Sequence, residues 1–255
     1  MINFIAIIPA RYASTRFPGK PLVDIFGKTM IQRVYEKAKK SFNYVVVATD
    51  DCRIAENVES FGGVAVMTST HHKSGTDRCQ EAATKAKQLF ATHFDVIINI
   101  QGDEPFVDNS QLEAIKGCFD DTDCQIATLV KSFSQQEDIF NENSPKVVLS
   151  NSSYAIYFSR SPIPFIRGKQ RDEWSKSHTF YKHIGLYGYR SEVLRAITTL
   201  PQGQLEISES LEQLRWLENG YKIKTAITHS ISHAIDTPDD LEKVLSIYKE
   251  SHIDV

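Results

Sequence analysis

The sequence has little cysteine and no long apolar run. None of its apolar stretches approaches the roughly 20 residues that a membrane-spanning helix needs, so we expect no membrane partner. The N-terminal apolar run has no basic residues before it and ends at Pro9, so we expect no secretion signal. The four cysteines form no CxxC pair, which argues against a zinc site, and the chain is too long for a small disulfide scaffold. We therefore expect free thiols and a location in the reducing cytoplasm.

Charge and missing motifs exclude further classes of protein. The net charge of −3 argues against broad nucleic-acid binding, which needs a basic surface, although a few local cations can still hold a small phosphorylated ligand. The chain has no P-loop spacing, no GxGxxG dinucleotide fingerprint and no GxSxG nucleophile elbow. These absences argue against P-loop nucleotide hydrolases and dinucleotide-dependent oxidoreductases.

The first half of the chain alternates between buried strands and amphipathic helices. A continuous apolar run, typical of a strand covered on both faces, occurs at 4–8, and further strand patterns rich in apolar residues occur at 44–49, 64–67 and 95–100. Helical patterns follow at 30–40, at 52–61, and after the cap candidates Ser74 and Thr76. This order predicts an α/β fold with a doubly wound, mostly parallel, Rossmann-like sheet and right-handed crossovers. The length suits one domain spanning 1–255.

The second half has a different pattern. Strand-like pieces around proline-containing turns in 126–190 predict a sheet edge with an inserted excursion that covers the site or mediates dimerisation. Residues 208–219 have a helical pattern that ends at Gly220. Thr237, followed by Pro238 and by an acidic residue three positions after Thr237, predicts the start of the last helix.

A basic loop follows the first predicted strand. Arg11, Arg16 and Lys20 share this loop with small residues, which let backbone N–H groups face outward. Fixed cations and free amides after the first strand of an α/β sheet favour binding of a polyphosphate. A solvated basic loop is the alternative, but three cations directly after a core strand favour the phosphate site.

Aspartates follow other predicted strands. Ligands of such sheets bind at the carboxyl ends of the strands, so we expect Asp50 and Asp103 to converge with the basic loop. Asp103, in the motif NIQGDEP at 99–105, is a candidate Mg²⁺ ligand, with an ordinary turn as the alternative. Asp236 is the candidate for a second metal carboxylate. Favourable charge at a helix start explains Asp236 almost equally well.

The segment HKSGTDR at 72–78 is a third candidate. The hydroxyl groups of Ser74 and Thr76, with Gly75 and Arg78, suit hydrogen bonding to the edge of a nucleotide base. A simple helix start is the alternative. The adjacent histidines at 71–72 cannot face one ligand from a regular element, so we expect no metal site there.

Together these segments resemble the 3-deoxy-manno-octulosonate (Kdo) cytidylyltransferases, the CMP-Kdo synthetases of lipopolysaccharide assembly, over almost the whole chain. The basic loop is shared with other sugar nucleotidyltransferases, whereas the segments of the second half are more specific, and the polar segment at 167–177 looks variable. The matching segments are IPARYASTRFPGKPL (8–22), HKSGTDR (72–78), NIQGDEP (99–105), PKVV (145–148), YFSR (157–160), HIGLYGY (183–189), ESLEQLR (209–215) and DTPDDL (236–241).

The resemblance implies a nucleotidyltransferase that transfers CMP from CTP to the anomeric 2-hydroxyl of Kdo and releases pyrophosphate. It implies that Arg11 and Lys20 hold the triphosphate, and that Asp103 and Asp236 hold Mg²⁺; these four are the implied catalytic residues. The implied nucleotide-binding residues are Ala10, Arg11, Arg16, Lys20, Ser74, Thr76, Arg78 and Gln101.

The same resemblance assigns the acid sugar to the second half and implies a homodimer. Arg160 is the candidate for the Kdo carboxylate because a guanidinium can bind a carboxylate through two hydrogen bonds. Without the resemblance, Arg160 would be an arginine on a sheet edge and His183 a core histidine. Glu209 and Gln213 are four residues apart, so we expect them to share a helix face. The implied sugar-binding residues are Arg160, His183, Tyr187, Glu209 and Gln213.

Other functions remain as alternatives. The same chemistry on another acid sugar, as in CMP-sialate synthesis, is the first. An acceptor such as methylerythritol phosphate is the second, and it would leave the motifs of the second half unexplained. A nucleotide-binding regulator without catalysis is the third, but a regulator has no need for both Asp103 and Asp236 beside Arg11 and Lys20.

Overall fold

A computed structural model describes residues 2–13, 16–230 and 234–250, with side chains up to residue 247. The chain divides into two compact units. Unit 1 comprises Met1–Leu112 and Ser230–Val255, and unit 2 comprises Glu113–His229. The predicted excursion at 126–190 lies inside unit 2, while the single domain over 1–255 and the role of the excursion in dimerisation stay predictions.

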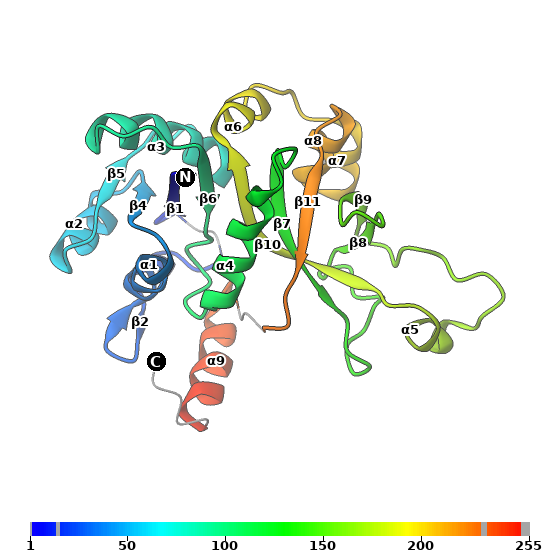
Figure 1. Ribbon diagram of the computed structural model, residues 1–255. Helices are drawn as coiled ribbons and strands as arrows, with labels where there is room; N and C mark the ends of the chain where they lie inside the picture. The colour runs from blue at the N-terminus through cyan, green and yellow to red at the C-terminus, as the bar shows by residue number, and fades with distance from the viewer. Residues whose placement is uncertain (1, 14–15, 231–233, 251–255) are drawn as a thin grey trace. The chain divides into compact units, whose positions relative to one another are not determined.

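Unit 1 is built on parallel strands, as the alternation of strands and helices predicts. The strand order is β6-β1-β4-β5, with β1 between β6 and β4 (Figure 1). Strands β1 and β4 are almost entirely buried because helices cover both of their faces. The strands are β1 (Phe4–Ala10), β4 (Tyr44–Thr49), β5 (Ala65–Met67) and β6 (Val96–Asn99).

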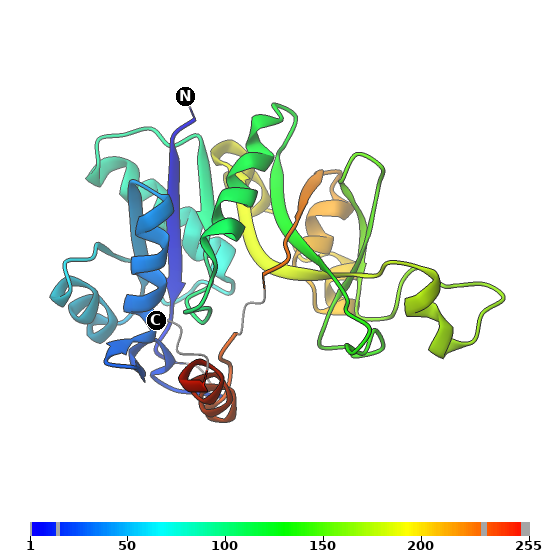
Figure 2. The same ribbon diagram turned by 60° about the horizontal axis from the view of Figure 1, so that its bottom comes forward.

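Three helices connect these strands: α1 (Met30–Ser41), α2 (Cys52–Ser60) and α3 (Gly75–Leu89). Helices α1 and α3 lie on opposite faces of the strands (Figures 1 and 2). Each helix begins with a residue whose side chain accepts a backbone N–H of the first turn. These capping residues are Thr29, Asp51 and Ser74, respectively. The buried face of α1 is the one that its helical period predicts, with Ile31, Val34, Tyr35 and Ala38.

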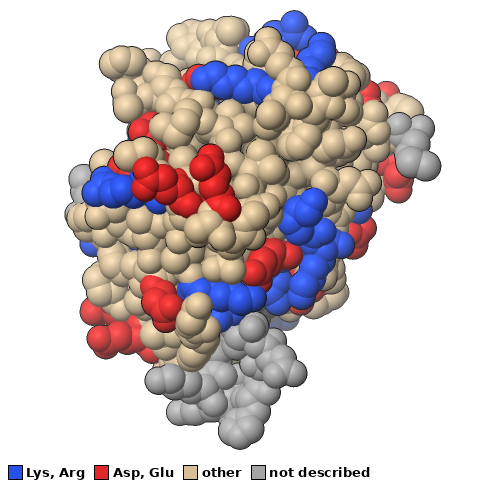
Figure 3. Space-filling view, turned by 90° about the vertical axis from the view of Figure 1, so that its left-hand side faces the viewer, with Lys and Arg blue, Asp and Glu red and all other residues tan. Residues whose placement is uncertain are grey.

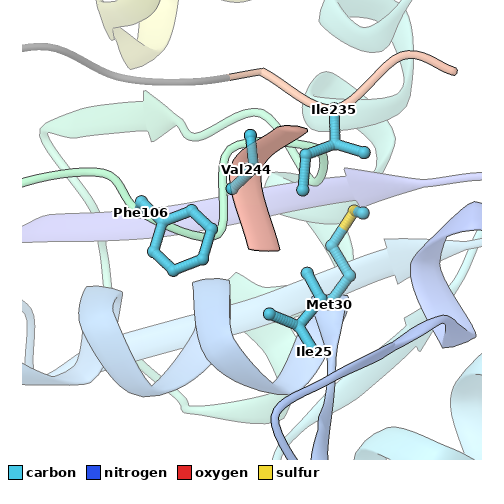
Figure 4. Close-up of a cluster of buried hydrophobic side chains, with 5 residues drawn as sticks. All are labelled: Ile25, Met30, Phe106, Ile235 and Val244. Atoms are coloured by element: carbon cyan, nitrogen blue, oxygen red, sulfur yellow. The ribbon is translucent and has the colours of Figure 1, made fainter. Parts of the chain in front are cut away.

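The last helix of unit 1 is α9 (Pro238–Glu250), and it begins with the predicted cap. Thr237 Oγ1 accepts the Asp240 N–H at 3.2 Å, and the Asp240 carboxylate accepts the Thr237 N–H at 2.9 Å. Just before this cap, Ile235 is fully buried in an apolar cluster (Figure 4). The other buried members are Ile25, Met30, Phe106 and Val244. The cluster therefore anchors the backbone next to Asp236.

Unit 2 contains a mixed sheet. Strand β10 pairs antiparallel with β7 and β8, β8 pairs antiparallel with β9, and β11 pairs parallel with β7. These strands are β7 (Ile126–Ser132), β8 (Lys146–Leu149), β9 (Ala155–Ser159), β10 (Tyr181–Arg190) and β11 (Ile223–Ile227). The predicted strand-like pieces of 126–190 are thus strands, and together with unit 1 they confirm the α/β class.

The prediction of one helix over 208–219 is wrong. Two short helices, α7 (Gln204–Glu209) and α8 (Gln213–Glu218), occupy this segment. Between them Ser210 adopts φ 51°, a left-handed conformation that ends α7 although the residue is not glycine. Glu209 therefore ends one helix and Gln213 begins the next, so the two do not share a helix face.

Several elements were not predicted from the sequence. A segment that carries α5 extends away from the rest of unit 2 in both ribbon views (Figures 1 and 2). There Trp174, only 4% exposed, packs with Ile139 and Phe180, so the polar segment at 167–177 contains an aromatic anchor. The unpredicted elements are η1 (Lys20–Leu22), β2 (Asp24–Ile25), β3 (Lys28–Thr29), α4 (Asn109–Gly117), η2 (Cys118–Asp120), η3 (Arg171–Glu173), α5 (Trp174–Ser177), α6 (Ser191–Ile197) and β11.

Candidate active site

Unit 1 has a cavity of about 450 Å³ at the carboxyl ends of its strands. The end of β1 and the loop after it, the start of α3, the turn after β6 and the residue before the α9 cap line this cavity. Ligands of doubly wound sheets bind at this position. The predicted site residues that line it are Ala10, Arg11, Arg16, Lys20, Arg78, Gln101, Asp103 and Asp236.

Two glycines shape the walls of the cavity. Gly19 has φ 73°, and its N–H donates to the Tyr12 carbonyl at 2.9 Å, which folds the basic loop back before Lys20. A Cβ on Gly102 would lie 2.8 Å from the Pro9 carbonyl oxygen, so only glycine lets the turn after β6 approach the end of β1. Ser14 and Thr15 of the basic loop lie outside the described residues.

Lys20 lies between the two predicted metal carboxylates. Its Nζ is 2.7 Å from Asp103 Oδ2 and 3.1 Å from Asp236 Oδ1, and its side chain is only 13% exposed. The backbone joins the same two segments, because the Ile235 N–H donates to the Asp103 carbonyl at 3.0 Å. Asp103 and Asp236 are more than 100 positions apart in the sequence, yet both of their carboxylates contact the same cation.

The donor set of this pair suits magnesium. Mg²⁺ in such sites takes one or two protein carboxylates and keeps water and phosphate oxygens in its other positions. In the described part of the chain, no three His, Cys, Asp or Glu side chains gather around a common point. Asp103 and Asp236 thus fit an ion shared with a phosphate ligand rather than an ion enclosed by protein. Lys20 demonstrates that one cation can contact both carboxylates.

Two arginines supply further positive charge at the cavity. Arg16 is 65% exposed and lies 3.3 Å from Asp236 Oδ1. Arg11 is exposed and has no hydrogen-bond or ion-pair partner among the described residues. Because its guanidinium satisfies no protein carboxylate there, Arg11 is available to an anionic ligand.

The base-side segment, residues 72–78, is predicted to contact the nucleotide base, but its contacts within the protein are mainly structural. Ser74 Oγ accepts the Asp77 N–H at 3.1 Å as the cap of α3, and Thr76 is buried. Arg78 is 1% exposed, and its guanidinium donates to Asp50 at 2.7 Å. The helix-start alternative thus describes Ser74, and the nucleotide-binding roles of Ser74, Thr76, Arg78 and Gln101 stay predictions.

Arg78 also explains the position of the Asp50 carboxylate. We expected Asp50 to converge with the basic loop, but it is held by Arg78 and is not among the residues that line the cavity. A second donor of the same guanidinium reaches Thr68 Oγ1 at 2.6 Å. The contact fixes the carboxyl ends of two neighbouring strands and the start of α3.

Glu81 of α3 was not singled out from the sequence. Its carboxylate accepts from the Ser69 N–H at 2.9 Å, from Lys85 at 2.6 Å, and pairs with His72 Nε2 at 2.5 Å. Partial burial raises the pKa of Glu81, but these hydrogen bonds outweigh it and hold the pKa at about 2. An ionised Glu81 therefore fixes the loop that leads into the base-side segment.

In unit 2, Arg160 and Glu209 belong to one hydrogen-bond network. The Glu209 carboxylate accepts from the Arg160 N–H at 2.8 Å and from Ser159 Oγ at 2.6 Å. The Arg160 guanidinium donates to backbone carbonyls, through Nε to Glu209 at 2.7 Å and through Nη1 to Glu142 at 2.9 Å. A third bond, from Nη2 to the Ser210 carbonyl, is 3.3 Å long. These bonds join the end of β9 to the break between α7 and α8.

His183 and Tyr187 lie together on β10, with ring centroids 5.3 Å apart. His183 Nε2 is 3.1 Å from Thr128 Oγ1, and burial lowers the pKa of His183 to about 4, so the imidazole is neutral at pH 7. Burial raises the pKa of Tyr187. Gln213 is also buried, and its Nε2 has no hydrogen-bond partner among the described residues. An unpaired buried amide donor is costly, so it points to a missing acceptor.

Comparisons with known proteins decide the family. The sequence pattern of the cytidylyltransferase family matches residues 5–223. A 3-deoxy-manno-octulosonate cytidylyltransferase of Parabacteroides distasonis is 61% identical over 250 residues, which is 96% of this chain and 98% of the relative. One of Bacteroides thetaiotaomicron is 59% identical over 244 residues, covering 94% of this chain and 96% of the relative. The chain belongs to the 3-deoxy-manno-octulosonate cytidylyltransferase family.

A solved structure agrees with this family assignment. The structure of CMP:2-keto-3-deoxy-manno-octonic acid synthetase complexed with CTP has a TM-score of 0.88 to this chain at 41% identity, covering 98% of this chain and 99% of that one. This member of the cytidylyltransferase family is therefore a nucleotidyltransferase with the predicted α/β fold. Of the helices that the structure describes, none is long and apolar enough to cross a membrane.

Several contacts of this cytidylyltransferase chain were missed from the sequence. Thr128, which contacts His183, carried no signal because it is one polar residue within the apolar stretch 126–130. Lys146 did carry a signal: it lies in the PKVV segment, which matched the family pattern but received no role. The structure shows Lys146 fully buried next to Arg160.

Proposed function

We propose that this chain transfers CMP from CTP to the anomeric 2-hydroxyl of Kdo, forming CMP-Kdo and pyrophosphate. The observation that carries the proposal is the 61% identity, over almost the full length of both chains, to a 3-deoxy-manno-octulosonate cytidylyltransferase. The cavity of unit 1 supports it, because four cations and two carboxylates line it at the carboxyl ends of parallel strands.

The chemistry is an in-line attack of the sugar hydroxyl on the α-phosphorus of CTP, which the protein assists by positioning and charge neutralisation. Arg11 and Arg16 are exposed at the cavity and would bind the triphosphate. Lys20 is held by two carboxylates, so its ammonium keeps one position and would offset the charge that develops on the leaving pyrophosphate.

Magnesium is part of the proposal, with Asp103 and Asp236 as its ligands. When bound, it would neutralise phosphate oxygens and lower the pKa of the attacking hydroxyl. The anchoring of Asp236 by the apolar cluster around Ile235 supports this role, because a metal ligand needs a fixed backbone (Figure 4).

The acid sugar is assigned to unit 2. The Arg160 guanidinium has five N–H donors and uses three on backbone carbonyls, which leaves one on each Nη for the Kdo carboxylate. His183, Tyr187, Glu209 and Gln213 are the proposed partners of the sugar hydroxyls. The unpaired Nε2 of Gln213 supports its part in this set.

We also propose a cytoplasmic homodimer that binds no nucleic acid. Five large apolar side chains of unit 2 are exposed, which favours a protein partner for this unit: Ile156 at 59%, Phe165 at 74%, Leu205 at 37%, Ile207 at 57% and Ile227 at 50%. All four cysteines are free thiols, as a reducing compartment requires. On the face shown in Figure 3, basic and acidic side chains are interspersed, which does not favour binding to nucleic acid.

The decisive experiment measures pyrophosphate release with CTP, Mg²⁺ and either Kdo or sialic acid. We expect release with Kdo alone. Release with sialic acid alone would keep the phosphate and metal assignments but overturn the acceptor. No release with either sugar, together with tight CTP binding, would favour the regulator.

A further inference from the structure

Lys146, the first residue of β8, is a buried ammonium without a paired carboxylate. The residue is fully buried, and its Nζ donates to the carbonyl oxygens of Asn141 at 2.7 Å and Arg160 at 2.6 Å. Among the described residues, no carboxylate lies within ion-pair distance of this nitrogen. Burial lowers the pKa of Lys146. A buried ammonium costs stability relative to an apolar residue, so packing alone does not explain this lysine.

The contacts of Lys146 lead to Arg160. The carbonyl of Arg160 accepts from Lys146, while the N–H of Arg160 donates to the Glu209 carboxylate at 2.8 Å. Side chains from two other segments thus hold both backbone polar groups of Arg160. The backbone from which the guanidinium extends is therefore fixed from both sides.

Lys146 and Arg160 also bind the same loop. Lys146 holds the Asn141 carbonyl, and Nη1 of Arg160 holds the carbonyl of the next residue, Glu142, at 2.9 Å. Two cations bound to consecutive carbonyls act as one unit, because displacing either would move the loop that the other holds. This arrangement orients the Arg160 guanidinium and places a second positive charge at the Arg160 backbone.

We infer that Lys146 is the positioning residue for the carboxylate of the acid sugar: it fixes Arg160 and places a second, buried positive charge at the backbone of Arg160. The inference rests on the proposed function, since it concerns the sugar half of that site. Lys146 need not touch the sugar. Its role is to make the two free N–H groups of Arg160 a preorganised receptor for a carboxylate.

The test compares Lys146→Met, which keeps the length but removes the charge and donors, with the wild type in the pyrophosphate assay. We expect the KM for Kdo to rise about 10-fold or more, as for loss of hydrogen bonds to a charged group, with the KM for CTP unchanged. Lys146→Gln keeps a donor without the charge, so its KM for Kdo should lie between those of the wild type and Lys146→Met. This variant carries the test if the methionine variant does not fold.

The matched control is Lys224→Met. Lys224 lies in the same unit, and its Nζ contacts Asp121 at 3.2 Å and the Ser152 carbonyl at 3.1 Å. This variant should lower the melting temperature but leave both KM values unchanged. Equal rises of both KM values in Lys146→Met, or no rise for Kdo, would overturn the inference. A wild-type enzyme that does not use Kdo would instead overturn the proposed function, so the two failures are distinguishable.

Discussion

Single residues at the cavity show how charge is balanced before any ligand binds. Lys20 neutralises Asp103 and Asp236, and Arg16 adds a second contact to Asp236. Asp236 is thus paired with two cations, whereas a residue that merely starts a helix would need none. This pairing favours a functional role for Asp236 over the helix-start explanation, because the cap itself is supplied by Thr237 and Asp240.

Substitution Asp236→Asn tests this role. The side chain keeps its size and the buried neighbour Ile235 keeps its packing, so we expect an unchanged melting temperature within a few degrees. Turnover should fall by about 10²-fold or more, because one of the two negative charges proposed to hold Mg²⁺ is lost. Steady-state kinetics at saturating CTP, Kdo and Mg²⁺ measures the effect.

Asp239→Asn is the matched control. Asp239 lies in the first turn of α9 and is exposed, so it shares the favourable charge at the helix start without lining the cavity. Its turnover should stay near the wild-type value. If both variants kept full activity at saturating Mg²⁺, Asp236 would be a helix-start residue only.

Elements of unit 1 were predictable because short-range rules determine them. Apolar stretches predicted the parallel strands, and the cap candidate Ser74 predicted the start of α3, whereas the caps Thr29 and Asp51 were found only in the structure. Since the carboxyl ends of parallel strands meet at one edge, the convergence of Lys20 and Asp103 followed as well.

The break between α7 and α8 was not predictable from the sequence. No glycine or proline interrupts 204–219, so the apolar period continues through the break. Tertiary contacts determine the break instead, since Nε and Nη2 of Arg160 bind the carbonyls of Glu209 and Ser210. The geometry around Arg160 and Glu209 was therefore not predictable from the sequence, and the set of sugar-binding residues stays a prediction.

The left-handed backbone conformation of Ser210 predicts how a glycine at this position would change the stability of the protein. Glycine adopts φ 51° without the Cβ clash that a serine meets there, so Ser210→Gly should stabilise unit 2 by about 0.5–1 kcal/mol. Chemical denaturation measures the change in the free energy of unfolding. The same substitution two residues earlier, Ser208→Gly, lies within α7 and should destabilise by a similar amount. Two changes of the same sign would show that the conformation of Ser210 is not strained.

For the whole molecule, both units bury an ion pair, Arg78 with Asp50 in unit 1 and Arg215 with Glu206 in unit 2, and unit 2 also holds polar groups that have no opposite charge beside them. In unit 1, Lys20 of the cavity pairs with Asp103, and Arg78 forms an internal ion pair with Asp50, so both partners of each contact are charged. Unit 2 buries Lys146 against carbonyls and keeps His183 neutral. A change of pH toward mild acid should therefore act first on unit 2, where a proton would have to be added to the neutral, half-buried ring of His183.

The stability of the protein should fall between pH 7 and pH 5 because of His183. Its pKa is about 4 in the folded state, lowered by burial from an ordinary 6.5, so the unfolded chain binds the proton first. The free energy of unfolding then falls as pH drops below 6.5, by about 1–2 kcal/mol at pH 5. Glu81 contributes little in this window, because its stabilising effect is lost only as pH falls from the ordinary carboxylate pKa of 4.5 toward its folded pKa of about 2.

Urea denaturation at pH 7 and pH 5 measures this loss in the wild type and in His183→Gln, whose amide can still donate to Thr128 Oγ1. The variant should be less stable at pH 7 but should lose about 1–2 kcal/mol less than the wild type on acidification. His71→Gln, at an exposed histidine of unit 1, should keep the wild-type dependence on pH. An equal loss in wild type and His183→Gln would mean that another group takes up the proton, and His183 would then not be held neutral by the fold.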